Sequence, residues 1–173
     1  MSRKQKSQAG FTIIEVMLVT LIIGVLGSVA IASSRDYTRR ASISEVVLAA
    51  SRCKNAVSEG YSLLDSAPVA GRWGCESGTP TGKYSGHMQT DSNGVIRIKV
   101  DNLDRAVNGR YVYLIPARND GRTALTTSGD LGSGQGVRAW ICGSDWLLIR
   151  NALPSNCRID TTSYAGDGGG FAN

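Results

Sequence analysis

One carboxylate, Glu15, lies inside an apolar run that extends from residue 10 to residue 32 and carries no other charge. Placing a carboxylate deep in apolar surroundings costs on the order of a few kcal/mol, so such a residue marks a functional contact or a position near a membrane surface. Cleavage of the chain after Gly10 would create a positively charged α-amino group on Phe11, one helical turn from Glu15. This amine could pair with Glu15 of its own chain or of a neighbouring chain. The simpler alternative is that Glu15 only snorkels to the membrane surface.

The cysteines are the second group that can do chemistry. They form an even set, which is typical of disulfide-bonded proteins of oxidising compartments: Cys53, Cys75, Cys142 and Cys157. Of the three possible pairings we favour Cys53 with Cys75 and Cys142 with Cys157, because each closes a short loop. A metal site is not expected, since no Cys-x-x-Cys occurs and His87 is the only histidine.

Other arrangements that could support catalysis are weak. No Gly-x-Ser-x-Gly pattern supplies a serine nucleophile for His87. The glycine-rich stretch 128–136 lacks the Lys-Ser/Thr ending of a phosphate-binding loop, and we interpret it as a loop between strands. Asp101 and Asp104 lie near a turn, where capping explains them better than acid-base chemistry. We therefore expect neither an enzyme nor a bound cofactor.

The apolar run is long enough to place Glu15 in a membrane. A helix over residues 11–32 would be about 33 Å long at a rise of ~1.5 Å per residue, which matches the hydrocarbon thickness of a bilayer. The preceding residues carry Arg3, Lys4 and Lys6, so they should stay in the cytoplasm while the chain beyond the run is exported. Because Gly10 precedes the apolar run, cleavage there would keep the membrane anchor.

The string Gly-Phe-Thr-Ile-Ile-Glu at residues 10–15 resembles the type IV prepilin processing motif. The resemblance implies that a prepilin peptidase and methyltransferase cuts after Gly10 and N-methylates Phe11. It also implies that Glu15 attracts the N-terminus of a neighbouring subunit during assembly. Residues 35–45 are similar to the stretch where a pilin helix enters the globular head, and residues 140–157 to the C-terminal disulfide-bonded region of pilins.

The chain departs from many major pilins at Ala32, where those proteins carry a proline that marks a helix segment loosened in the filament. Without that proline, Gly24 and Gly27 are the remaining weak positions, since each glycine costs ~1 kcal/mol relative to alanine inside a helix.

Beyond the apolar run, the pattern predicts an amphipathic helix over residues 33–60 that ends near Gly60. Its apolar residues recur at spacings of three and four: Ile43, Val46, Val47, Ala50, Cys53, Val57 and Tyr61. Residues 71–94 have a loop composition, with Trp73 as their notable apolar residue. Strands are predicted at residues 95–100, 110–115, 136–142 and 146–149. The expected fold is α+β, with an antiparallel sheet of about four strands packed on the second half of the long helix.

Net charge gives little support for nucleic-acid binding. Removal of Arg3, Lys4 and Lys6 with the leader lowers the formal charge from +5 to +2. We expect the basic cluster just beyond the apolar run to pack against acidic neighbours in a filament, with a weak contact to DNA as an open hypothesis: Arg35, Arg39 and Arg40.

The tail after Cys157 has two interpretations. Residues 166–170 are predicted to be flexible, as is common at a chain end. Alternatively, the tail covers a sheet edge or reaches an adjacent subunit, with Tyr164 and Phe171 as anchors.

Together these features predict a structural subunit of a type IV pilus, similar to a type IVa major pilin and used for adhesion and twitching motility, with DNA uptake as an open further role. The expected domains are a removed leader (1–10), a transmembrane and filament-core helix (11–32), an amphipathic helix (33–60) and a globular head (61–173). The subunit is expected to sit in the inner membrane with its head in the periplasm before assembly, and in an extracellular pilus afterwards.

The expected partners are further copies of the chain, the peptidase, the inner-membrane assembly machinery and minor pilins, with host surfaces and DNA as further candidates. Two alternatives stay open: a minor pilin or pseudopilin of a secretion system, and a membrane-anchored adhesin that never polymerises. The adhesin would need no free N-terminus at Phe11.

Overall fold

The computed structural model describes residues 10–134, 136–165 and 170–171, with the backbone alone for residues 30–33 and 165. The chain divides into two compact units, the first ending at Tyr37 and the second starting at Thr38. The elements along the chain are α1 (Ile13–Leu63), β1 (Ser85–Thr90), β2 (Ile96–Val100), β3 (Tyr111–Ala117), α2 (Thr127–Asp130), β4 (Ala139–Ser144), α3 (Leu147–Ala152), the 3-10 turn η1 (Ser155–Cys157), β5 (Ile159–Asp160) and α4 (Thr162–Ala165). The α+β fold class is as predicted.

Helix α1 is continuous through Gly24 and Gly27 and passes the predicted end at Gly60. Its last turn is closed by a hydrogen bond from the Leu64 N–H to the Gly60 carbonyl (3.0 Å). A Cβ at residue 60 would come within 2.8 Å of the Trp73 ring. The lack of a side chain at Gly60 therefore lets the Trp73 ring pack against the helix, and Gly60 does not mark the end of the helix.

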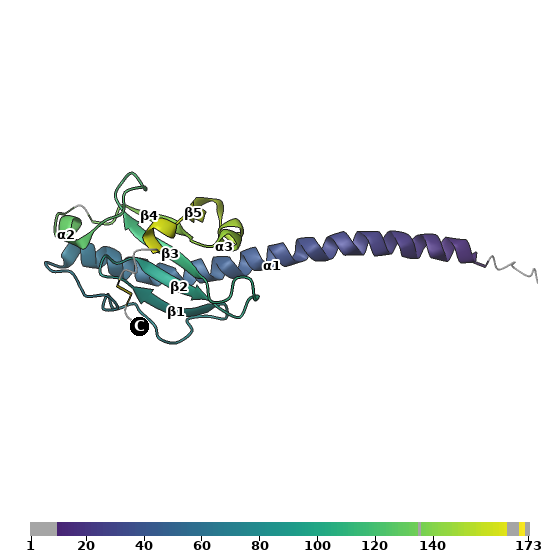
Figure 1. Ribbon diagram of the computed structural model, residues 1–173, viewed down its shortest axis with the longest axis horizontal. Coiled ribbons are helices and arrows are strands. Elements are labelled where there is room, and N and C mark those ends of the chain that lie inside the picture. The colour runs from purple at the N-terminus through teal and green to yellow at the C-terminus, as the bar shows by residue number, and fades with distance from the viewer. Residues whose placement is uncertain (1–9, 135, 166–169, 172–173) are drawn as a thin grey trace, which may run out of the picture. The chain divides into compact units, whose positions relative to one another are not determined.

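The sheet of the second unit has five strands in the order β1-β2-β3-β4-β5 (Figure 1). The first three pairings are antiparallel, whereas β5 pairs with β4 in parallel. On the outer side of β1, Ser77 of the preceding loop forms an isolated antiparallel bridge to Met88 of that strand. The predicted antiparallel sheet of four strands is therefore a mixed sheet of five.

Strand β2 follows the predicted alternation. Ile96, Ile98 and Val100 are fully buried on one face, whereas Arg97 and Lys99 on the other face are half-buried. The register carries this alternation across the sheet, because Ile98 lies opposite Val112, and Arg97 lies opposite Tyr113. A single face of the sheet thus supplies the strand residues of the main core.

The second half of α1 covers this face (Figure 1) with the predicted apolar stripe. Six of the seven predicted residues are fully buried and Val47 is partly buried: Ile43, Val46, Ala50, Cys53, Val57 and Tyr61. The Tyr61 ring stacks on Trp73 at 5.6 Å between ring centres, and its hydroxyl donates to the Asn93 carbonyl (2.8 Å). Burial raises the pKa of Tyr61 far above its usual range, so the phenol stays neutral.

Two elements differ from the predictions. Residues 85–90 were expected to be a loop but form β1, whose sequence Ser-Gly-His-Met-Gln-Thr has little strand propensity and contains an irregularity in register. Residues 146–149 were expected to be a strand, yet Leu147–Ala152 is helix α3. A short apolar run fits a buried strand and a buried helical turn equally well, so periodicity could not separate them.

The chain after Cys157 covers one edge of the sheet, as one interpretation of the tail proposed. Ile159 lies opposite Gly143 of β4, and Asp160 forms an ion pair with Arg150 of α3. Tyr164 and Phe171 pack against a smaller apolar cluster on the opposite face of the sheet from α1: Val95, Tyr113, Ile115, Ala117 and Ile141. Most of the predicted flexible stretch, residues 166–169, lies outside the described residues.

Candidate functional site

The bond predicted to be cleaved, between Gly10 and Phe11, precedes the helix. Both residues are exposed, and 82% of Phe11 is accessible to solvent. Nothing lies within 4 Å of the position that a Cβ of Gly10 would occupy. Because α1 starts only at Ile13, a peptidase would meet an open and non-helical backbone at this bond.

Thr12 caps the start of α1. Its hydroxyl accepts a hydrogen bond from the Glu15 N–H (3.3 Å), and its carbonyl accepts from the N–H groups of Glu15 (3.1 Å) and Val16 (3.3 Å). The order Thr-x-x-Glu is that of a capping box, and it places the Glu15 carboxylate in the first helical turn, where the helix dipole favours negative charge. This second role of Glu15 was not predicted, although the spacing of Thr12 and Glu15 signals it.

Within the first unit, residues 13–29 present an apolar surface with little polar interruption. Large apolar side chains are exposed along it, from Ile13 (81%) to Val29 (68%). The hydroxyls of Thr20 and Ser28 donate to helix carbonyls at 3.0 and 2.8 Å, so the helix itself satisfies them. Within the described residues, α1 is the one helix long and apolar enough to cross a membrane. Glu15 is the one ionisable side chain among residues 11–34.

Two disulfides brace the second unit. Cys53 of α1 is bonded to Cys75 in the loop before β1, and Cys142 of β4 is bonded to Cys157 of η1. These are the two pairs favoured by loop length. The first bond ties the loop 64–84 to the helix, and the second holds the chain around α3 against the sheet.

One arginine of the basic cluster that follows the apolar run, Arg39, forms an ion pair within the chain. Arg39 contacts Asp104 through two nitrogens, Nε at 3.0 Å and Nη2 at 2.9 Å. Asp104 also accepts a hydrogen bond from the Ala106 N–H (2.8 Å), which agrees with the capping role predicted for it. Arg35 and Arg40 are exposed.

Among the described residues, no group of three or more His, Cys, Asp or Glu side chains could hold a metal ion. His87 is exposed on β1, as expected for a solvated residue.

The models of two protein families match this chain. Residues 39–158 match the pilin family of bacterial filaments. Residues 5–31 match the prokaryotic N-terminal methylation motif, which spans Gly10, Phe11 and Glu15.

Individual relatives agree with this assignment. The chain is 32% identical over 163 residues to the type IV major pilin protein PilE of Neisseria gonorrhoeae, covering 87% of this chain and 94% of the relative. It is 32% identical over 160 residues to the fimbrial protein EcpC of Eikenella corrodens, covering 90% and 94%. It is also 32% identical over 172 residues to a fimbrial protein of Neisseria meningitidis serogroup A, covering 87% and 94%. With a methylation motif at its N-terminus, an exposed apolar helix and a disulfide-braced head, the chain belongs to the type IV pilin family of bacterial filament subunits.

Proposed function

We propose that this chain is a major subunit of a type IV pilus and that it polymerises with further copies through residues 11–32. The observation that carries the proposal is the apolar surface of α1, on which Glu15 is the only ionisable group among residues 11–34. Exposed apolar surface costs about 25 cal/mol per Å² in water, so this helix needs either a bilayer or other copies of itself around it.

In this proposal the leader, residues 1–10, is removed by a prepilin peptidase that also methylates Phe11. The basic leader stays in the cytoplasm, so residues 11–32 anchor the subunit in the inner membrane and the head, residues 61–173, lies in the periplasm. The assembly machinery and minor pilins then move the subunit into an extracellular fibre. The open backbone at Gly10 and the methylation motif support this route.

Glu15 sets the register between copies. Once Phe11 carries a free amine, a neighbour's amine can approach Glu15, whose backbone N–H is already held by Thr12. An apolar bundle penalises any stagger that leaves a charge without a partner, so the pairing selects one arrangement. Contacts of this head-to-tail kind do not close into a ring and therefore generate a filament.

A fibre of this kind would serve adhesion and twitching motility, with DNA uptake as a further role. The relatives with major pilin and fimbrial names support the filament. Two other functions compete with this proposal and are distinguished by the tests below. The chain could be a minor pilin or pseudopilin, or an anchored adhesin that does not polymerise.

The first test is intact mass spectrometry, with and without reduction, of material sheared from native cells. We expect an abundant species that starts at methylated Phe11 and gains about four hydrogens on reduction of two disulfides. A protein found only in membranes, yet cleaved at Phe11, would support the minor pilin or pseudopilin. An intact leader would contradict the proposal.

The second test replaces Glu15 by alanine. We expect the yield of sheared filaments to fall at least about tenfold, because the variant loses a charge pair worth a few kcal/mol in apolar surroundings. Glu59→Ala, at an exposed position near the other end of α1, is the matched control and should leave the yield unchanged. Normal filament yield from Glu15→Ala would refute the assembly role of this residue.

A further inference from the structure

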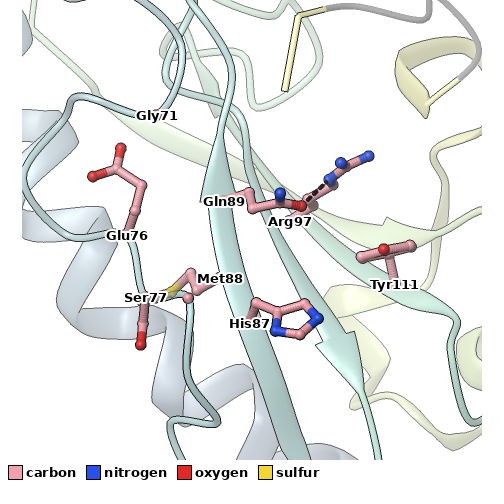
Figure 2. Close-up of a pocket in the computed structure, with 9 residues that line it drawn as sticks. Gly71, Glu76, Ser77, His87, Met88, Gln89, Arg97 and Tyr111 are labelled. Atoms are coloured by element: carbon pink, nitrogen blue, oxygen red, sulfur yellow. Dashed lines mark hydrogen bonds between the residues drawn. The ribbon is translucent and has the colours of Figure 1, made fainter. Parts of the chain in front are cut away.

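A cavity of about 520 Å³ lies beside β1 and extends over the strand face that points away from the main core (Figure 2). Side chains from three neighbouring strands and the preceding loop line it: His87 and Gln89 of β1, Arg97 of β2, Tyr111 of β3, and Glu76 and Ser77 of the loop. All of them belong to the second unit. This volume is within the range of small-ligand sites in proteins.

Arg97 is held in one orientation in this cavity. Its Nε donates a hydrogen bond to the Gln89 side-chain oxygen (2.9 Å), which Figure 2 marks. The guanidinium carbon lies 4.0 Å from the ring centre of Phe171 and 4.9 Å from that of Tyr111. Contacts with two aromatic rings and an amide leave the two terminal nitrogens of the guanidinium as a fixed fork.

This cation has no carboxylate partner among the described residues. Lys99, which projects from the same strand on the same face, differs in this respect because its ammonium is paired with Asp101 at 3.3 Å. The nearby Glu76 is already engaged. Its carboxylate accepts hydrogen bonds from the N–H groups of Trp73, Gly74 and Cys75 at 2.8 to 3.0 Å, and from the Thr90 hydroxyl.

The balance of charge selects the class of ligand. A polyanion such as a nucleic acid requires several cations along its path, whereas the described lining of this cavity offers the guanidinium of Arg97 and has a carboxylate in its wall. A single carboxylate suits the fork of Arg97, which can donate two parallel hydrogen bonds to it. The Tyr111 ring offers an apolar surface, and the exposed imidazole of His87 is a polar group that can bond a hydroxyl.

We propose that this cavity binds a carboxylate-bearing saccharide, with the carboxylate on the terminal nitrogens of Arg97 and the sugar ring against Tyr111. Uronic acids and sialic acids both carry this chemistry. The site deepens the proposed role in adhesion and rests on it, since the head must be displayed at the cell surface to meet such a ligand.

The test measures binding to the full mature chain in detergent by isothermal titration. The probes are methyl galacturonide and the methyl glycoside of N-acetylneuraminic acid, with methyl galactoside as the neutral comparison. We expect at least one acidic sugar to bind and the neutral sugar to bind about tenfold more weakly or not at all. The acidic sugar that binds identifies the source of the carboxylate.

Three variants locate the site. Arg97→Gln should weaken binding of the acidic sugar at least about tenfold, and Arg97→Lys, which keeps the charge but loses the fork, should weaken it by an intermediate factor. Lys99→Gln is the matched control and should bind as the unaltered chain does. Melting temperatures establish whether each variant is folded. If Arg97→Gln does not fold, the comparison of Arg97→Lys with the unaltered chain provides the test.

Equal binding of the neutral and acidic sugars, or binding that survives both Arg97 variants, would overturn the site. Arg97-dependent binding of a DNA oligonucleotide without binding of either acidic sugar would also overturn it. Filament yield of the same variants is measured separately, so a subunit that assembles but binds no sugar refutes this inference alone.

Discussion

At the scale of single residues, the Glu76 carboxylate organises the loop that leads into β1. Burial acts to raise the pKa of Glu76, but hydrogen bonds from Thr90 and from the N–H groups of Trp73 and Cys75 outweigh it and hold the pKa below its usual value. A carboxylate with a lowered pKa in the folded state stabilises the fold above its ordinary pKa. This stabilisation is lost as the pH falls through the lower pKa of the folded state.

We therefore predict that Glu76→Gln lowers the free energy of unfolding by about 1 kcal/mol at pH 7, after discounting charged hydrogen bonds for partial exposure. The difference from the unaltered chain should shrink as the pH falls below 4.5, the ordinary value for this group. Chemical unfolding of both proteins between pH 3 and pH 7 measures it. Glu59→Gln, at an exposed position on α1, is the control, and a difference independent of pH would contradict this role of the carboxylate.

At the scale of elements, the pairing of β4 with β5 depends on one glycine. A Cβ at residue 143 would lie 1.9 Å from the Ile159 carbonyl oxygen, and backbone atoms cannot move aside as a flexible side chain can. Overpacking of this kind costs about 1 to 3 kcal/mol and sometimes more.

The corresponding prediction is that Gly143→Ala destabilises the chain by about 3 kcal/mol and separates β5 from β4. Thermal unfolding gives the first effect, and hydrogen exchange at the N–H of Thr161, which bonds to the Ser144 carbonyl, reports the second. Gly78→Ala is the matched control, because nothing lies within 4 Å of the position that its Cβ would occupy. Equal stability of the two variants would show that β5 adapts without loss.

Elements with strong periodicity were predictable from the sequence, and those defined by long-range pairing were not. The stripe from Ile43 to Tyr61 and the alternation in β2 are enough by themselves to indicate which faces are buried. Strand β1 has no such pattern and becomes a strand only because β2 pairs with it. The cavity around Arg97 could not be predicted from the sequence for the same reason, because Gln89 reaches Arg97 only through the pairing of β1 with β2.

At the scale of the whole molecule, the two units have separate tasks. Every residue of the main core lies after Thr38, and both disulfides lie within the second unit. The first unit has the exposed apolar surface and Glu15.

We predict that residues 38–173, produced in an oxidising compartment, fold alone and stay monomeric. Their melting temperature should lie within a few degrees of that of the head in the full chain held in detergent, because the truncation removes no residue of the main core. Light scattering after size-exclusion chromatography and calorimetry provide the two measurements. Filaments formed by this fragment would contradict the assignment of assembly to residues 11–32.

Parts of both edges of the sheet are covered, which matters when many heads are packed together in a fibre. Identical domains held side by side are the situation in which bare strand edges join into cross-β stacks, the arrangement of amyloid. In the part of the chain that the structure describes, Ser77 bridges Met88 on the outer side of β1, and β5 pairs with the last two residues of β4, Gly143 and Ser144. At these positions the backbone of a neighbouring head cannot add to the sheet, which helps a dense fibre to remain an ordered and separable assembly of folded domains.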